Sequence, residues 1–223
     1  MTTFILVPGG WHGGWYFQPI ADALRRHGHT AHPVTLTGLG SLDGRADQPT
    51  PAINLDTHIQ DVVTLLEAED IHDAVLVGHS YAGMVITGAA ARTSGRVRRL
   101  VYADAYVPAD GDSCYGLSNA AHRELFLQGA QDDGLTVAPP PRLVDARTAP
   151  HPLASLLQKI RLENEPRVQR KDYIYLTGWD ATPFTEVYRR LRRDPDWHVH
   201  TLPTGHNVVR EAPEPLVRIL MEG

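Results

Sequence analysis

The chain has 223 residues, a formal net charge of −5 at pH 7, and 42% hydrophobic and 21% charged residues. This length and balance are typical of one soluble globular domain and argue against extensive disorder. The mildly acidic total argues against nucleic acid or an anionic membrane surface as the main partner. The single cysteine, Cys114, excludes an intrachain disulfide and a cysteine-based zinc site.

The N-terminal apolar stretch is too short to be a targeting segment. It covers residues 4–7, has no basic flank and ends in Pro8. No window approaches the roughly 18 apolar residues that a membrane helix needs. We therefore expect a cytoplasmic protein with no membrane partner, either a monomer or a small homo-oligomer.

Short β-branched runs alternate with helical patterns along most of the chain. The runs predict strands at Phe4–Val7, Thr30–Val34, Ala74–Val77, Arg99–Ala103, Tyr173–Thr177 and Trp197–Leu202. The helical patterns cover Phe17–His27, Thr57–Glu69 (opening with a capping-box pattern, Thr57-x-x-Gln60), Tyr81–Ala91, Phe184–Arg193 and Pro215–Glu222. This alternation predicts an α/β fold with a mostly parallel, doubly wound sheet, and the continuous apolar runs predict helices on both of its faces.

One segment, residues 108–170, interrupts the alternation. It contains the run Pro139-Pro140-Pro141 and weak helical patches but no clear strand. Loops this long inside a compact domain are uncommon and usually functional. We interpret residues 108–170 as a short helical cap inserted into a single domain whose core is residues 1–107 and 171–223.

The segment Gly78-His79-Ser80-Tyr81-Ala82-Gly83 follows an apolar strand and opens a helix rich in small residues. That context is the one a G-x-S-x-G nucleophile turn requires, although Ala82 stands at the second glycine and Gly83 follows it. A plain βα turn with a serine cap is the alternative. The placement after a buried strand favours Ser80 as a nucleophile, because a helix N-terminus favours the negative charge that develops beside it.

The glycine-rich loop 9–15 follows the first strand and suits a site for an oxyanion. It lacks the spacing and the basic residue of a phosphate-binding loop. We expect the backbone N–H groups of Gly10 and Tyr81 to be the oxyanion donors. Side chains of this loop and of the segment after the fourth strand are expected to bind substrate: Trp11, His12, Trp15 and Tyr106.

A histidine late in the chain is expected to be the general base, with an aspartate to orient it. His206 follows the last strand and so lies at the same sheet edge as Ser80. Most of the other eleven histidines are expected on the surface. Asp180 and Asp104 each follow a strand, and either could reach His206. We give Asp180 a slight preference, because its loop position is the commoner one for this role.

These motifs together resemble the α/β-hydrolase superfamily, and within it the small esterases that include plant methylesterases, hydroxynitrile lyases and bacterial pyrethroid-hydrolase-like esterases. The resemblance covers nearly the whole chain. It implies an α/β-hydrolase fold, Ser80 as nucleophile, His206 as base, and oxyanion donors at Gly10 and Tyr81. Matching Pro183 to the proline that follows the family's acid loop places Trp179 at the aspartate position, which keeps Asp104 as a candidate acid.

The predicted function is that of a serine hydrolase that cleaves a small, largely apolar carboxylic ester or lactone through an acyl-enzyme on Ser80. No metal or organic cofactor is expected, and the partner is a small-molecule substrate. The first alternative is a lyase, dehydratase or cyclase of secondary metabolism that uses the same serine and histidine as acid and base. The second is a non-catalytic ligand-binding protein on the same fold.

Overall fold

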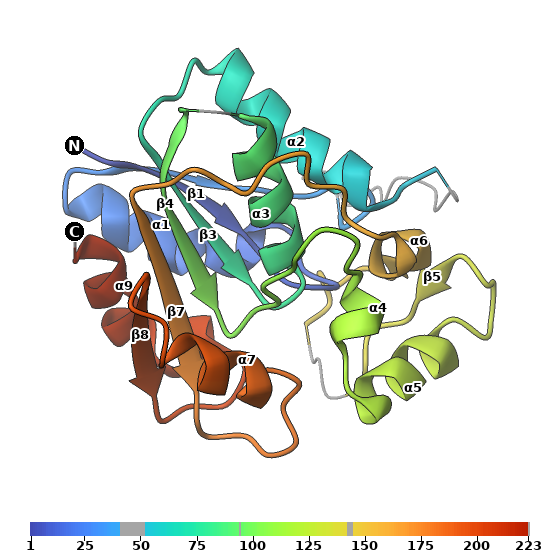
Figure 1. Ribbon diagram of the computed structural model, residues 1–223. Coiled ribbons are helices and arrows are strands. Elements are labelled where there is room, and N and C mark those ends of the chain that lie inside the picture. Colours follow the sequence, from blue (N-terminus) through green and yellow to red (C-terminus); the bar gives the residue numbers. More distant parts are fainter. Residues whose placement is uncertain (41–51, 94, 142–144, 223) are drawn as a thin grey trace.

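The computed structural model describes residues 1–40, 52–93, 95–141 and 145–222. Its centre is a six-stranded sheet in the order β2-β1-β3-β4-β7-β8, in which all neighbouring strands are parallel (Figure 1). The strands are β1 (Thr3–Val7), β2 (Thr30–Pro33), β3 (Ala74–His79), β4 (Val97–Ala103), β7 (Arg170–Leu176) and β8 (Trp197–Leu202). The six strands predicted from the sequence are confirmed within a few residues of their ends.

The strand order reverses its direction next to β1. The chain moves from β1 to β2 on one side, then crosses back to β3 and continues outward through β4, β7 and β8. Loops at the carboxyl ends of the strands diverge at such a reversal, and ligands of open α/β sheets bind there. The glycine-rich loop after β1 and the serine after β3 both lie at this point of the sheet.

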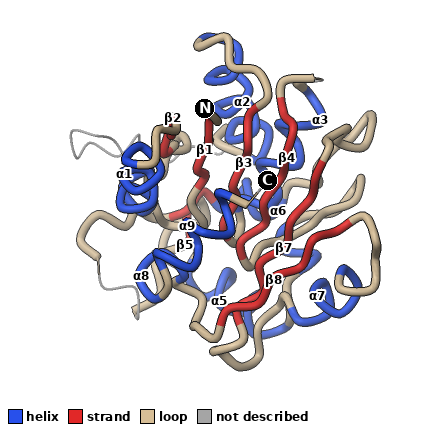
Figure 2. Tube along the Cα trace, turned by 90° about the vertical axis from the view of Figure 1, so that its left-hand side faces the viewer, coloured by secondary structure: helices blue, strands red, loops and turns tan. Residues whose placement is uncertain are grey.

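Helices cover both faces of the sheet because successive strand residues point to opposite sides. Phe4 and Leu6 pack on the face covered by α1 (Gln18–Arg26) and α9 (Pro213–Met221), and α9 lies in front of the sheet in Figure 2. Ile5 and Val7 belong to the opposite cluster, as do buried residues of three other helices. These helices are α2 (Leu55–Ala68), α3 (Ala82–Arg92) and α7 (Thr185–Leu191). The predicted doubly wound architecture is confirmed.

The capping box of α2 lies one turn earlier than the sequence pattern suggested. Asn54 is the N-cap, and its side chain accepts a hydrogen bond from the Thr57 N–H while the Thr57 hydroxyl accepts one from the Asn54 N–H. The predicted Thr57-x-x-Gln60 box is therefore wrong. Thr57 occupies the third helical position, where it closes the box begun by Asn54.

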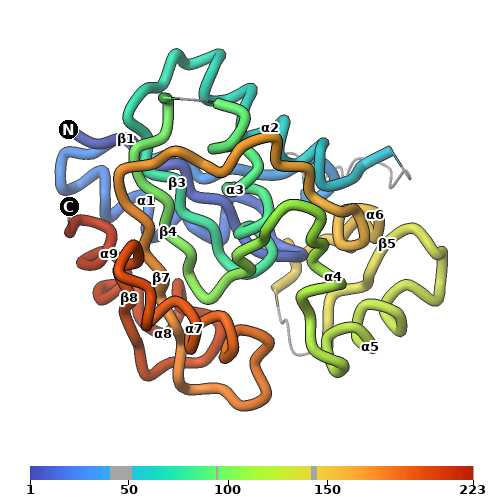
Figure 3. Tube along the Cα trace, in the orientation of Figure 1, coloured from blue at the N-terminus to red at the C-terminus, as the bar shows by residue number. Residues whose placement is uncertain are grey.

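The segment predicted as a cap contains more regular structure than expected. It carries α4 (Cys114–Leu117), α5 (Ala120–Gly129), α6 (Leu153–Leu157) and two short antiparallel strands, β5 (Thr136–Val137) and β6 (His151–Pro152). The expectation of no strand here was wrong, because two-residue strands leave no period in the sequence. Figure 3 shows these elements gathered on the side of the molecule away from the two termini. The division into core and cap stays an interpretation.

Two short elements complete the description of the chain. These are a 3-10 turn, η1 (Gly14–Phe17), after the glycine-rich loop, and a one-turn helix, α8 (Val208–Glu211), after β8. Among the described residues, no helix is both long and apolar enough to span a bilayer.

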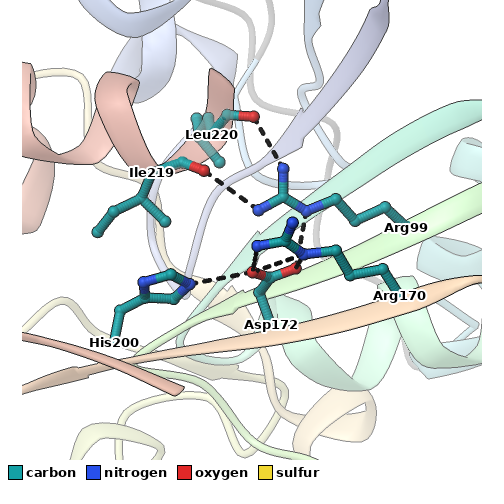
Figure 4. Close-up of polar contacts among 6 residues, drawn as sticks. All are labelled: Arg99, Arg170, Asp172, His200, Ile219 and Leu220. Carbon is teal, nitrogen blue, oxygen red and sulfur yellow. Dashed lines mark hydrogen bonds and ion pairs between the residues drawn. The ribbon is translucent and has the colours of Figure 1, made fainter. Parts of the chain in front are cut away.

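A buried ionic cluster joins β4, β7, β8 and the C-terminal helix (Figure 4). The Asp172 carboxylate accepts hydrogen bonds from Arg99 Nε at 2.7 Å, from Arg170 and from His200 Nε2 at 3.0 Å. The remaining guanidinium nitrogens of Arg99 donate to the carbonyls of Ile219 and Leu220, at 3.1 and 2.9 Å. Arg99 thus connects the middle of the sheet to the carbonyls of the last turn of α9.

Asp172→Asn should destabilise the protein most at neutral pH. Burial opposes ionisation of Asp172, but hydrogen bonds from His200, Arg99 and Arg170 outweigh it and hold the pKa well below its usual value. The carboxylate therefore contributes stability above the unfolded-state pKa of about 4, and this contribution is lost as the pH falls below it. Removing one partner of a buried pair typically costs about 3–5 kcal/mol.

Urea unfolding at pH 7 and pH 3 measures this effect. The difference in unfolding free energy between the wild type and Asp172→Asn should be large at pH 7 and smaller at pH 3. Asp196→Asn, at an exposed carboxylate, is the control and should change little at either pH. An equal loss at both pH values would contradict the prediction.

Candidate active site

Ser80 occupies a strained turn between β3 and α3. Its φ angle is 55°, a left-handed conformation that is uncommon for residues other than glycine. The surrounding backbone holds it there: the Ser80 N–H donates to the carbonyl of Ala103, and the Ser80 carbonyl accepts from the N–H groups of Gly83 and Tyr106. Strained backbone that is fixed in this way is typical of functional sites.

Glycines beside Ser80 are required by close approach of the backbone. A Cβ at Gly83 would lie 1.9 Å from the Tyr106 carbonyl oxygen, and a Cβ at Gly9 would lie 2.9 Å from Ser80 Cβ. Ala82, at the motif's second glycine, is buried at the start of α3. The close contact that needs a glycine therefore falls one residue later than in G-x-S-x-G, which explains how the chain accommodates Ala82.

His206 lies after β8 and is oriented by a buried carboxylate. Its Nδ1 lies 2.8 Å from Asp104 Oδ2, and the Asp104 side chain is 0% exposed. Asp104 also accepts hydrogen bonds from the indole N–H of Trp179 at 3.0 Å and from the Leu176 N–H at 3.3 Å. An ionised Asp104 accepts from Nδ1–H, which leaves His206 Nε2 unprotonated and able to accept a proton.

The aspartate in contact with His206 is Asp104, which corrects the preference for Asp180. Asp104 follows β4 directly, with a φ angle of 46° that aspartate tolerates, and its N–H donates to the Ile174 carbonyl. The Asp180 side chain is exposed in the loop after β7. That loop instead contributes Trp179, the neighbour of Asp180, as a hydrogen-bond donor to Asp104.

His79 forms a hydrogen bond with the backbone of His206. Its Nε2 lies 2.8 Å from the His206 carbonyl oxygen, so this nitrogen carries the proton and donates it. Burial, and then the proximity of His206, hold the pKa of His79 well below its usual value. A neutral His79 adds no positive charge beside His206, and its ring stacks on Tyr16.

Two spaces lie next to each other at Ser80 and His206. The inner one is a cavity of about 60 Å³ between the sheet edge and the segment 108–170. The outer one is a cleft of about 450 Å³ that opens to solvent. Both are lined by Gly10, Trp11, Ser80, Trp179 and His206.

The inner cavity is mostly apolar, with walls made by the cap and by Phe184, the residue before α7. Its other lining residues are Tyr81, Tyr106, Cys114, His122, Leu125, Phe126, His151, Leu156 and Phe184. The outer cleft has a more polar wall: Gly9, His12, Tyr16, His79, Pro140, Asn207 and Glu211.

Three of the four side chains expected to bind substrate line these spaces. Trp11 and Tyr106 line the inner cavity, and His12 lines the outer cleft. His12 Nδ1 also lies 2.7 Å from the Gly10 carbonyl oxygen, a hydrogen bond within the loop, and burial lowers its pKa. Trp15 lines neither space, and its ring instead packs against the Arg147 guanidinium at 4.0 Å.

Sequence reasoning missed several residues of the site. His58, His79 and His151 are fully or nearly fully buried, although most histidines were expected on the surface. Trp179 was noted only as the residue at the aspartate position of the family match. His151 carried no signal, because it belongs to the segment without periodicity. Among the described residues, no group of three or more potential metal ligands occurs.

Comparison with known proteins identifies the family to which this site belongs. A sequence model of the alpha/beta hydrolase family matches residues 4–219. The chain belongs to this family. It is 38% identical to a carbendazim hydrolyzing esterase of Nocardioides sp. (strain SG-4G), over 99% of this chain and 98% of that protein. This full-length match, together with the family, makes the protein a carboxylic ester hydrolase.

Other relatives support the resemblance drawn from the sequence. An alpha-hydroxynitrile lyase of Arabidopsis thaliana is 28% identical over 58% of this hydrolase and 48% of the lyase. An extracellular α/β-hydrolase from a Paenibacillus species shares the fold, with a TM-score of 0.81 and 22% identity over 99% of this chain and 98% of that one. The predicted fold and family are confirmed.

Replacing each candidate acid of the hydrolase by asparagine should show which of the two is needed for catalysis. Asp104 contacts His206, so Asp104→Asn should lower kcat about 10⁴-fold, as loss of the orienting aspartate does in serine proteases. Asp180→Asn should change kcat less than about threefold, as is usual for exposed sites. Steady-state kinetics of both purified variants measures this. A loss confined to Asp180→Asn would contradict the assignment.

Replacing Trp179 should change the pH dependence of the activity of the hydrolase. Burial raises the pKa of Asp104 to about 7, whereas hydrogen bonds from Leu176 and Trp179 favour the ionised form. The Asp104–His206 pair titrates as a unit, and activity should fall as the pH drops and the pair binds a proton. Trp179→Phe removes a donor to the carboxylate, so the pair binds this proton more tightly.

The acid limb of kcat/KM should therefore move to higher pH in Trp179→Phe, by about half a unit or more. Phe184→Leu is the control, because Phe184 also packs on the His206 ring but donates no hydrogen bond. It should change KM without moving the limb. An unshifted limb in Trp179→Phe, or the same shift in both variants, would contradict the prediction.

Proposed function

We propose that the protein is a serine hydrolase that cleaves small, largely apolar carboxylic esters or lactones through an acyl-enzyme on Ser80. The observation that carries the proposal is one juxtaposition. A serine in a strained turn and a histidine bonded through Nδ1 to a buried aspartate line the same two spaces.

The mechanism follows from the roles that this geometry permits. His206 Nε2 accepts the proton of the Ser80 hydroxyl while Ser80 Oγ attacks the carbonyl carbon of the ester. His206 then gives that proton to the alkoxide, which leaves as the alcohol. Water attacks the acyl-enzyme in the second half, with His206 again as base, and releases the carboxylic acid and Ser80. Asp104 stabilises the imidazolium that forms in each step.

The backbone N–H groups of Gly10 and Tyr81 are the proposed oxyanion donors. Gly10 lies in the loop after β1 and Tyr81 is the residue after Ser80, and both line the inner cavity together with the nucleophile. Such a donor typically contributes about 3–4 kcal/mol to transition-state stabilisation. Tyr81 is also the N-cap of α3, where the helix dipole favours a developing negative charge.

The two spaces at Ser80 suggest how an ester is divided between them. The inner cavity of about 60 Å³ admits only a small apolar group, whereas the cleft of about 450 Å³ accepts a larger one. The substrates to test first are therefore esters with one small side, and carbendazim, which the relative from Nocardioides is named for hydrolysing, belongs with them.

The lyase alternative gains no support from the site. The family resemblance links hydroxynitrile lyase chemistry to a lysine in the cap, and this chain has two lysines, Lys159 and Lys171. Lys159 is exposed after α6, and Lys171 lies in β7 with its amino group 5.3 Å from the Trp197 ring centroid. Neither lines the spaces at Ser80.

Covalent labelling of Ser80 tests the proposed function. A fluorophosphonate probe should label Ser80 in the wild type, as read by peptide mass spectrometry, and a p-nitrophenyl ester should give a burst of p-nitrophenol equal to the enzyme concentration when deacylation is slow. Ser80→Ala should lose both, with kcat reduced about 10⁶-fold. Heat-denatured protein controls for non-specific labelling. Ester turnover that persists in Ser80→Ala would refute the proposal, and cleavage of a cyanohydrin without ester turnover would favour the lyase.

A further inference from the structure

Trp11, the residue after the proposed oxyanion donor Gly10, is held by the cap on three sides. Its N–H donates to His151 Nδ1 at 3.4 Å, its indole Nε1–H donates to the Val137 carbonyl at 2.8 Å, and its carbonyl accepts from the Ala149 N–H at 3.0 Å. All three partners belong to β5, β6 or the residues just before β6. The cap is therefore bonded directly to the loop after β1.

The conformation of Trp11 explains why the loop needs such support. Its φ angle is 66°, in the left-handed region that is costly for a bulky side chain. Residues in such conformations persist only where the surroundings hold them, at a cost of about 1–3 kcal/mol each. The three hydrogen bonds from the cap help to offset this cost.

His151 occupies the centre of this contact. It is 0% exposed, and its ring centroid lies 4.7 Å from that of Tyr81 and 6.1 Å from that of Trp11. A Cβ at Gly10 would lie 3.6 Å from His151 Nδ1. One imidazole thus packs on Tyr81, lies next to Gly10, and accepts a hydrogen bond from the residue that follows Gly10.

The tautomer of His151 follows from its partners. Nδ1 accepts the Trp11 N–H, so Nε2 carries the proton and lies 2.9 Å from Ser155 Oγ, to which it donates. The Ser155 hydroxyl in turn donates to the Pro152 carbonyl at 2.8 Å. Burial, and then the neighbouring His58, hold the pKa of His151 well below its usual value, so the ring stays neutral. Both ring nitrogens therefore have hydrogen-bond partners within the protein.

We propose that His151 is a positioning residue for the oxyanion loop, which through the Trp11 N–H fixes the direction in which the Gly10 N–H points. The inference rests on the proposed hydrolase function. It makes the cap part of the catalytic geometry as well as a wall of the inner cavity. Misplacing a group by about 1 Å at a reacting centre can cost about 10²-fold in rate, so a loosened loop should lower kcat.

Replacing the imidazole separates this role from a packing role. His151→Phe keeps a ring in the cavity wall but removes the acceptor for the Trp11 N–H, and His151→Leu removes both. His151→Asn retains an acceptor close to the position of Nδ1. Gln158→Ala is the matched control, because Gln158 anchors the cap elsewhere, through two hydrogen bonds to Asp56 in α2.

Kinetics with a p-nitrophenyl ester should divide these variants into two groups. In His151→Phe and His151→Leu, kcat should fall about 10- to 100-fold with KM within about threefold. Inhibition by a trifluoromethyl ketone, which forms a tetrahedral adduct, should weaken in parallel with kcat/KM. His151→Asn should recover most of kcat, and Gln158→Ala should leave it unchanged. A wild-type kcat in His151→Phe, or an equal loss in Gln158→Ala, would overturn the inference.

Hydrogen exchange gives a readout that does not depend on activity. The Trp11 amide should exchange slowly in the wild type and in His151→Asn, and faster in His151→Phe. If neither His151→Phe nor His151→Leu folds, hydrogen exchange of the wild-type protein still tests the inference. A Trp11 amide that exchanges as fast as an exposed loop amide would overturn it. Ester turnover that Ser80→Ala leaves intact would overturn the proposed function and this inference together. Turnover that depends on Ser80 but not on His151 overturns only the inference.

Discussion

Everything at the site depends on how closely backbone segments approach one another around Ser80. The loop after β1 touches Ser80 at Gly9, and the start of α3 touches the carbonyl of Tyr106 at Gly83. These contacts leave no room for a Cβ, and they hold the left-handed turn in which Ser80 lines both spaces. The carboxyl ends of β1, β3 and β4 meet here because these strands are parallel neighbours, and the winding direction of the sheet reverses beside β1.

The two buried aspartates of this part of the sheet have opposite electrostatic settings. Asp172 is surrounded by Arg99, Arg170 and His200, whose hydrogen bonds lower its pKa and keep it ionised. Asp104 has N–H donors from Trp179 and Leu176 and the imidazole of His206, and burial raises its pKa to about 7. The first arrangement joins α9 to the sheet and serves stability. The second holds a buried carboxylate in a hydrogen bond to a histidine, a setting typical of catalytic groups.

The cap contributes to the site in two ways. It supplies the apolar wall of the inner cavity, which includes Phe126 and Leu156, and it is hydrogen-bonded to Trp11 in the loop after β1. Its second anchor, between Gln158 and Asp56, lies on α2, outside both spaces at Ser80. Substrate selection and the geometry of the oxyanion loop are therefore connected through one segment, and substitutions in β5 or β6 should affect both.

Local sequence patterns were enough to predict the alternation of strands and helices, the nucleophile turn and the late histidine. These features are local: apolar runs, a glycine pattern and a position after a strand can all be read from adjacent residues. The sequence could not choose between Asp104 and Asp180, because both follow strands that end at the same edge. Tertiary structure decided, since the register of β4 against β7 buries Asp104 under His206 while Asp180 points to solvent. It also revealed the contact between His151 and Trp11, because these residues lie 140 positions apart and no local pattern marks His151.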